Sequence, residues 1–158
     1  MHDVRRFVLH LTLALLVLAL DQFSKYWVLQ VFQPHEVLPV IPGFNLVLVF
    51  NEGAAFSFLS DAGGWQRGLF IVLTIIVSVM LLVWLARLSR HERWTGLGLS
   101  LVLGGALGNL IDRIRLGKVV DFLDVYWQQW HWPAFNLADS AITTGVMVLL
   151  WAAFRESG

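Results

Sequence analysis

The sequence predicts a mainly α-helical integral membrane protein, a bundle of four transmembrane helices with a small extracytoplasmic β-sheet. Hydrophobic residues make up 58% of the 158 residues and the mean hydropathy is +0.70, which is more apolar than the composition of a soluble domain. Four apolar stretches come close to the roughly 20 helical residues that cross a bilayer. Between the first two lies a loop rich in β-branched and aromatic residues, which are typical of strands.

The predicted spans cover residues 7–28, 68–88, 95–113 and 135–154. They leave little chain for a soluble domain, so we expect a single integral membrane domain over residues 1–158. The third span is the shortest and is rich in glycine, which lets helices approach closely, so we expect it at the centre of the bundle. Arg5 and Arg6 before the first apolar run also resemble the start of a cleaved secretory signal. Because polar residues at helical spacing prolong that run from Asp21 to Lys25 and no A-x-A-like site follows, we expect a retained helix.

The first long loop predicts a small sheet within residues 35–60. Residues 37–41 and 44–50 form β-branched or aromatic runs. They are punctuated by Pro39, Pro42 and Gly43, as strands and turns require. An irregular hydrophobic loop is the alternative.

Charge and composition exclude several classes of function. The formal net charge is zero and the chain has no cysteine, so thiol catalysis, thiolate metal sites and disulfides are excluded, and a nucleic-acid partner is not expected. Basic residues favour the cytoplasm, and those that flank the spans on one predicted side are Arg5, Arg6, Arg87, Arg90, Arg93 and Arg155. We therefore predict that both termini are cytoplasmic, although a comparable set lies on the other side: Lys25, Arg67, Arg113, Arg115 and Lys118.

Polar residues gather at the edges of the spans. A charge within the membrane is costly and usually kept for function, and placement at an edge lowers that cost. Asp21 and Lys25 are spaced i to i+4 and can pair along one helix face. At the end of the third span, an amide, a carboxylate and a guanidinium share one helix face, because Asn109, Asp112 and Arg113 are spaced i, i+3 and i+4. An internal charge balance between the last two is the structural alternative.

Two aspartates at either end of a Trp-rich loop, Asp121 and Asp139, are the strongest catalytic candidates. Two close carboxyl groups that share one proton can activate a water and protonate a leaving nitrogen, which is what amide hydrolysis requires. Asn136 lies three residues before Asp139, and a helix N-cap is the structural alternative for that pair. Spacing alone leaves Asp112 and Asp124 open as competing carboxylates.

Other classes fit the residues to different degrees. A small ion-coupled carrier or proton-conducting protein also uses intramembrane carboxylates, but a relay needs ionisable groups across the full membrane depth, whereas these gather toward one predicted face. A non-catalytic scaffold would leave the aspartates without a purpose. The scattered histidines form no H-E-x-x-H zinc motif. Gly98-Leu99-Ser100 resembles the glycine-serine turn of intramembrane serine proteases, but no histidine lies in a later span to serve as base.

The chain resembles signal peptidase II, the lipoprotein signal peptidase family of bacteria, along nearly its whole length. Five ordered motifs carry the resemblance: Asp21-Gln22 with Lys25, Asn51 with Gly53 to Phe56, Gly105 with Gly108-Asn109 and Asp112-Arg113, Val120-Asp121-Phe122, and Phe135-Asn136 with Ala138 to Ser140.

The resemblance implies an aspartic endopeptidase of the bacterial inner membrane that removes the signal peptide of a prolipoprotein just before its diacylglyceryl-modified cysteine. It implies four transmembrane helices, a small external sheet, no metal and no cofactor. The catalytic residues carry over to Asp121 and Asp139. Because only Asp121 matches the family's Val-Asp-Phe position, we interpret Asp124 as a loop or interface charge, and we interpret Asp112 as a structural partner at the end of the third span. The supporting residues carry over to Asp21, Asn51, Asn109, Arg113 and Asn136. Expected partners are the prolipoprotein and membrane lipids, with the protein itself a monomer.

Overall fold

The computed structural model describes residues 4–53, 65–89 and 91–156. Within these residues, four helices are long and apolar enough to cross a membrane. They are α1 (Val4–Val31), α2 (Trp65–Arg87), α3 (Arg93–Leu116) and α4 (Leu137–Glu156). The sequence prediction of four spans is therefore confirmed, and each helix extends a few residues beyond at least one of its predicted limits. Part of the predicted β-rich loop, residues 54–60, lies outside the described residues.

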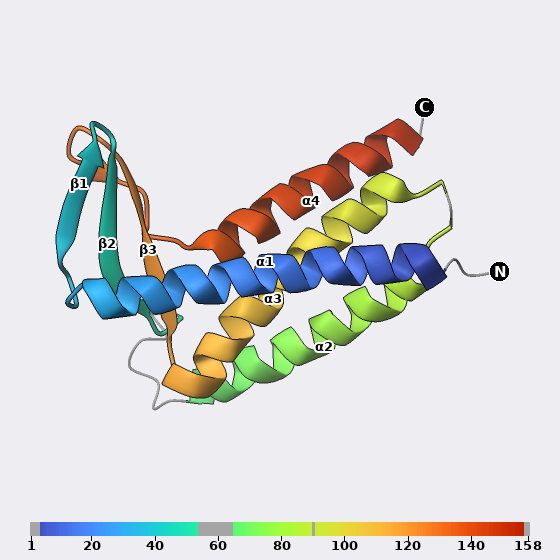
Figure 1. Ribbon diagram of the computed structural model, residues 1–158, viewed down its shortest axis with the longest axis horizontal. Helices are drawn as coiled ribbons and strands as arrows, with labels where there is room; N and C mark the ends of the chain where they lie inside the picture. The colour runs from blue at the N-terminus through green and yellow to red at the C-terminus, as the bar shows by residue number, and fades with distance from the viewer. Residues whose placement is uncertain (1–3, 54–64, 90, 157–158) are drawn as a thin grey trace.

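The sheet lies at one end of the bundle, whereas the described ends of the chain lie at the other (Figure 1). It contains β1 (Val37–Ile41), β2 (Phe44–Asn51), β3 (Val119–Trp127) and β4 (Trp130–His131), antiparallel in the order β1-β2-β3-β4. The two strands predicted from the first loop are confirmed. Strands β3 and β4 were not predicted, because we took residues 119–131 for a loop.

Helix α3 is the centre of the bundle, as its glycines predict (Figure 1). Five of its glycines face neighbouring helices with no room for a side chain. A Cβ at Gly98 would lie 2.9 Å from the carbonyl oxygen of Gly145 on α4, and one at Gly104 would lie 2.7 Å from Val17 on α1. Backbones can approach this closely only where the residue is small, which replaces a hydrophobic driving force inside lipid.

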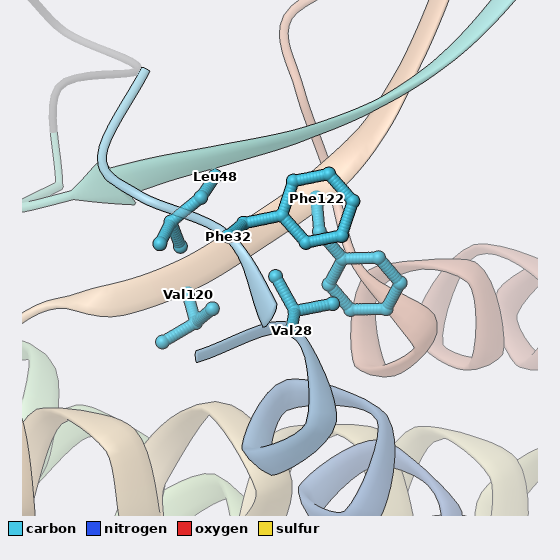
Figure 2. Close-up of a cluster of buried hydrophobic side chains, with 5 residues drawn as sticks. All are labelled: Val28, Phe32, Leu48, Val120 and Phe122. Atoms are coloured by element: carbon cyan, nitrogen blue, oxygen red, sulfur yellow. The ribbon is translucent and has the colours of Figure 1, made fainter. Parts of the chain in front are cut away.

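A cluster of buried apolar side chains fixes the sheet onto the end of α1. Figure 2 shows Val28 and Phe32 from the helix end beside Leu48 of β2 and Val120 and Phe122 of β3. All five side chains are buried. Because Asp121 lies between Val120 and Phe122, this packing fixes the backbone that carries Asp121.

Candidate active site

Asp121 lies on β3, where the strand runs directly from the end of α3. Helix α3 stops at Gly117, which adopts the left-handed conformation (φ 79°) and donates its backbone N–H to the carbonyl of Arg113 at 3.2 Å. Glycine takes this conformation without steric cost. Arg67 of α2 donates to the carbonyls of Arg113 (3.0 Å) and Ile114 (2.9 Å) and so satisfies the free end of the helix. The chain can then turn into β3 and bring Asp121 back over the bundle.

Asp139 lies in the first turn of α4, held by a reciprocal cap. The side-chain oxygen of Asn136 accepts the backbone N–H of Asp139 at 2.9 Å, and a carboxylate oxygen of Asp139 accepts the backbone N–H of Asn136 at 3.3 Å. This is the arrangement of a capping box. The N-cap alternative for this pair is therefore correct, and it places Asp139 at a fixed position rather than excluding it from the site.

The structure links both aspartates through Asn136. Its side-chain amide donates to Asp121 at 2.7 Å and its backbone amide donates to Asp139. Asn51 of β2 donates to the other oxygen of Asp121 at 3.1 Å, and Asn109 of α3 donates to Asp139 at 2.7 Å. Residues that are remote in the sequence therefore meet where the sheet joins the bundle.

Burial and like charge favour the protonated form of Asp121, which is 2% exposed. Burial, followed by the negative charge of Asp139, raises the pKa of Asp121 from 3.8 to about 6, although hydrogen bonds from Asn51 and Asn136 oppose the shift. The Arg113 guanidinium interacts with the charges of both aspartates and lies 5.2 Å from the centre of the Phe70 ring. The result is a carboxyl group that can hold a proton near neutral pH beside a second carboxyl group, as acid–base chemistry requires.

A buried ion cluster holds the side-chain oxygen of Asn109. Lys25 is 2% exposed, and its ammonium group lies 2.9 Å from each of three oxygens, on Asp21, Asp112 and Asn109. Since the Asn109 oxygen faces this cation, its amide nitrogen is left to point at Asp139. Sequence spacing had correctly paired Asp21 with Lys25.

The charges of Asp112 and Arg113 interact, as the structural alternative has it, but the direct contacts of Asp112 lie elsewhere. Asp112 instead binds Lys25, accepts the side-chain amide of Gln22 at 2.9 Å, and accepts the backbone N–H of Val120 at 3.1 Å. It therefore fastens the start of β3, one residue before Asp121. The contacts of Asp112 agree with its interpretation as a structural partner at the end of α3. That Lys25 connects it to Asn109 was not predicted. The spacing of Lys25 from Asp21 was the only signal in the sequence.

Asp124, the other competing carboxylate, is also buried, but its hydrogen-bond partners differ from those of Asp121 and Asp139. Its carboxylate accepts the side-chain amide of Asn45 at 2.8 Å and lies 2.8 Å from Nδ1 of His131. These contacts join β2, β3 and β4. We had expected a loop or interface charge; it is instead a buried tie between strands.

Comparison with known proteins identifies the family. Residues 13–155 match the family described as signal peptidase (SPase) II. The chain belongs to the signal peptidase II family. It is therefore a peptidase of bacterial membranes.

Curated signal peptidase II relatives match nearly the whole chain. The lipoprotein signal peptidase of Pseudomonas fluorescens (strain Pf0-1) is 54% identical over 150 residues, which cover 92% of this chain and 87% of the relative. That of Shewanella baltica (strain OS155) is 54% identical over 141 residues, covering 89% and 82%.

Two solved structures, each described as a bacterial membrane enzyme determined by the in meso method, have the same fold. One, at 1.9 Å resolution, has a TM-score of 0.81 and 32% identity and covers 91% of both chains. The other, at 2.3 Å, has a TM-score of 0.84 and 31% identity and covers 100% of this chain and 94% of that one. The four-helix membrane fold with its small sheet is thus confirmed by both sequence and structure.

The structure gathers the residues that the signal peptidase II resemblance implied. Those that contact or bridge the two aspartates are Asn51, Asn109 and Asn136. Asp21 is one step further away: it accepts the backbone N–H of Ala138 at 2.9 Å and thereby ties α1 to the start of α4. The catalytic and supporting roles themselves stay predictions, as does the absence of a metal or cofactor.

Proposed function

We propose that this protein is an aspartic endopeptidase that cleaves the signal peptide of a prolipoprotein immediately before its diacylglyceryl-modified cysteine. The observation that carries the proposal is the bridge from Asn136 to both Asp121 and Asp139. The bridge joins two carboxyl groups from separate elements, and one of them has a pKa raised to about 6. Membership of the signal peptidase II family supplies the peptidase class.

In the proposed reaction, one aspartate is ionised and the other is protonated. The ionised carboxylate removes a proton from a water, whose oxygen attacks the scissile carbonyl carbon. The protonated carboxyl group donates its proton to the leaving nitrogen as the peptide bond breaks, so the dyad ends with the same number of protons. Arg113 provides positive charge near both aspartates, and that charge stabilises the oxyanion that develops on the substrate carbonyl.

An open cavity beside Asp139 supports binding of an apolar, lipid-bearing substrate. It has a volume of about 450 Å³ and is lined by Trp132, Phe135, Asp139, Thr143 and other residues of the β4–α4 connection and α4. Trp132 is 71% exposed. A diacylglyceryl group held against this apolar surface would contribute about 0.8 kcal/mol per buried methylene, so the anchor can supply much of the affinity.

The proposed topology has both termini in the cytoplasm and the active site on the extracytoplasmic face of the inner membrane. The described ends of the chain lie at the end of the bundle opposite the sheet (Figure 1), so one assignment follows from the other. We propose that the enzyme acts as a monomer without a metal or cofactor.

A proton-conducting carrier fits less well. Among the described residues, the buried ionisable side chains are Asp21, Lys25, Asp112, Asp121 and Asp124. Asp121 and Asp124 lie on β3, and the other three form one cluster that contacts the start of this strand through Asp112 and Val120. A relay across the membrane would need groups along its depth.

Cleavage by the purified full-length protein tests the proposal. In a non-ionic detergent it should release the signal peptide from a diacylglyceryl-modified prolipoprotein. Mass spectrometry should show a new N-terminus at the modified cysteine. The same prolipoprotein without the lipid is the matched control and should be cleaved far more slowly. Cleavage at another bond, or full activity with both aspartates replaced by asparagine, would overturn the proposal.

A further inference from the structure

The end of the bundle opposite the sheet carries a second polar region. Three open cavities meet there, with volumes of about 230, 470 and 270 Å³. Arg93, the first residue of α3, lines all three. The other basic residues that line one or two of them are Arg6, His10, His91 and Arg155. The ends of α1, α3 and α4 therefore direct positive charge into one place, far from the site described above (Figure 1).

One carboxylate opposes these charges among the described lining residues, that of Glu92. It accepts the backbone N–H of Ser89 at 2.7 Å. Hydrogen bonds from Ser89 lower the pKa of Glu92, so this group is ionised. Two guanidiniums, those of Arg93 and Arg155, against one carboxylate still leave an excess of positive charge, and the N-terminal dipole of α3 adds to it.

Two tryptophans hold two of the arginines in place. The indoles of Trp94 and Trp151 pack edge to face with their ring centres 4.9 Å apart. The Arg93 guanidinium lies 5.7 Å from the Trp94 ring centre, and that of Arg155 lies 5.4 Å from the Trp151 ring centre. Cation–π contacts restrict a guanidinium without consuming its N–H donors. The arginines are therefore positioned on either side of the 270 Å³ cavity with donors available for an anion.

We propose that this cluster of Arg93, Arg155, His91, Trp94 and Trp151 binds the phosphate headgroup of an anionic phospholipid. A guanidinium recognises phosphate oxygens through paired N–H donors. The site lies at the ends of membrane-length helices, the level at which headgroups and interfacial indoles are found.

The surroundings favour a lipid over a free phosphate ion. Apolar side chains continue from the cluster along the outer surface of α4, where Leu150 is 56% exposed, Met147 58% and Phe154 78%. Trp94 and Trp151 are themselves 37% and 45% exposed. This surface can receive acyl chains once the phosphate is bound at the arginines. A free phosphate would use only the arginines.

Lipid binding by the full-length protein tests the inference. In neutral detergent, phosphatidylglycerol should bind saturably by native mass spectrometry and raise the unfolding temperature. Phosphatidylcholine, which has no net charge, should do so much less. A basic residue near a headgroup contributes about 1 kcal/mol, so Arg93→Gln and Arg155→Gln should each weaken phosphatidylglycerol binding by about five-fold, and the double variant by about 25-fold.

Arg87→Gln is the matched control, because Arg87 is an exposed arginine in the last turn of α2, at the same end of the bundle, and does not line these cavities. It should bind phosphatidylglycerol as the unchanged protein does. Equal losses in Arg87→Gln and Arg93→Gln would mean diffuse attraction and would overturn the proposed site. Binding of inorganic phosphate as tight as that of phosphatidylglycerol would overturn the assignment to a lipid. Equal binding of the two phospholipids would overturn the requirement for an anion, and this comparison does not depend on how any variant folds.

Discussion

Asn136 donates its side-chain amide to a carboxylate oxygen of Asp121 at 2.7 Å. The side-chain oxygen of Asn136 also caps α4 by accepting the backbone N–H of Asp139. Asn136 is 0% exposed, so these contacts are fully buried. The residue that caps α4 is therefore also the one that sets the orientation of the carboxylate on β3. The cap of α4 and the orientation of Asp121 thus depend on the same side chain.

Replacement of either aspartate by asparagine should abolish cleavage. Asp121→Asn and Asp139→Asn keep the shape of the side chain but remove the proton exchange, so we expect turnover to fall by at least about 10²–10⁴-fold. Binding of the lipidated substrate should persist. Cleavage assays with parallel binding measurements check both points.

Asp124→Asn is the control for this pair. Asp124 is a buried carboxylate on the same strand as Asp121, but it is bonded to Asn45 and His131 instead. Its replacement should lower stability by about 1–3 kcal/mol through lost hydrogen bonds while most activity remains. An equal loss of turnover in Asp124→Asn would show that the wrong aspartate of β3 had been assigned.

The activity should decline above a pH of about 6. Burial and the charge of Asp139 raise the pKa of Asp121 from 3.8 to about 6, so the proton that the dyad shares is lost as the pH rises through that value. The rate constant kcat/KM should then fall about ten-fold per pH unit. By linkage, the contribution of this proton to the free energy of unfolding is complete below pH 3.8 and is lost as the pH rises to about 6.

Replacement of Asn51 tests whether Asp121 is the group whose titration lowers the activity. Its hydrogen bond lowers the pKa of Asp121, so Asn51→Ala should move the alkaline limb of the profile to higher pH. A limb that stays in place in Asn51→Ala would indicate that a different group is being titrated.

Lys25→Met should destabilise the protein strongly. The change leaves the carboxylates of Asp21 and Asp112 buried without their cation, which costs about 3–5 kcal/mol when one partner of a buried ion pair is removed. It should also reduce activity, because Asn109 loses the contact that orients it toward Asp139. Unfolding in detergent measures the first effect and cleavage the second.

Lys118→Met is the comparison, since Lys25 and Lys118 are the two lysines of the chain. The Lys118 ammonium lies 3.8 Å from the centre of the Phe50 ring, a contact worth about 0.5–1 kcal/mol at a partly exposed site. If the two substitutions proved equally costly, the buried cluster would have no special importance for stability.

Gly105→Ala should separate α3 from α4. A Cβ at this position would collide with the carbonyl oxygen of Ala138, next to Asp139, and would lie 2.8 Å from Ile142. Overpacking of this kind costs about 1–3 kcal/mol and would displace the start of α4, so both stability and turnover should fall. A thermal unfolding curve and a cleavage rate on the same sample measure the two effects.

Gly68→Ala, on α2, is the matched control. No described atom lies within 4 Å of a Cβ at this position. Alanine in a helix interior is favoured over glycine by about 0.5–1 kcal/mol, so this variant should be as stable as the original or slightly more so. Destabilisation by Gly68→Ala as large as that by Gly105→Ala would contradict the packing argument.

The sequence was a good guide where the signal is local. Apolar runs identified the four spans, and Pro39, Pro42 and Gly43 marked the first two strands. Strand β3 was missed because Asp121 and Asp124 interrupt its apolar pattern and make it look like a loop. Both are buried, and each is satisfied by partners from other elements, such as Asn51 and Asn45 on β2.

By itself the sequence determined the membrane class, the four spans, the central place of the glycine-rich helix and, through its ordered motifs, the family. The tertiary structure decided the pairings. It paired Asp112 directly with Lys25, made Asp124 a tie between strands, and joined Asp121 to Asp139 through Asn136. The physical reason is that the length and apolarity of a span are properties of one continuous segment. The partner of a buried charge depends instead on how distant segments pack, because the desolvated group must be satisfied by whatever lies beside it in space.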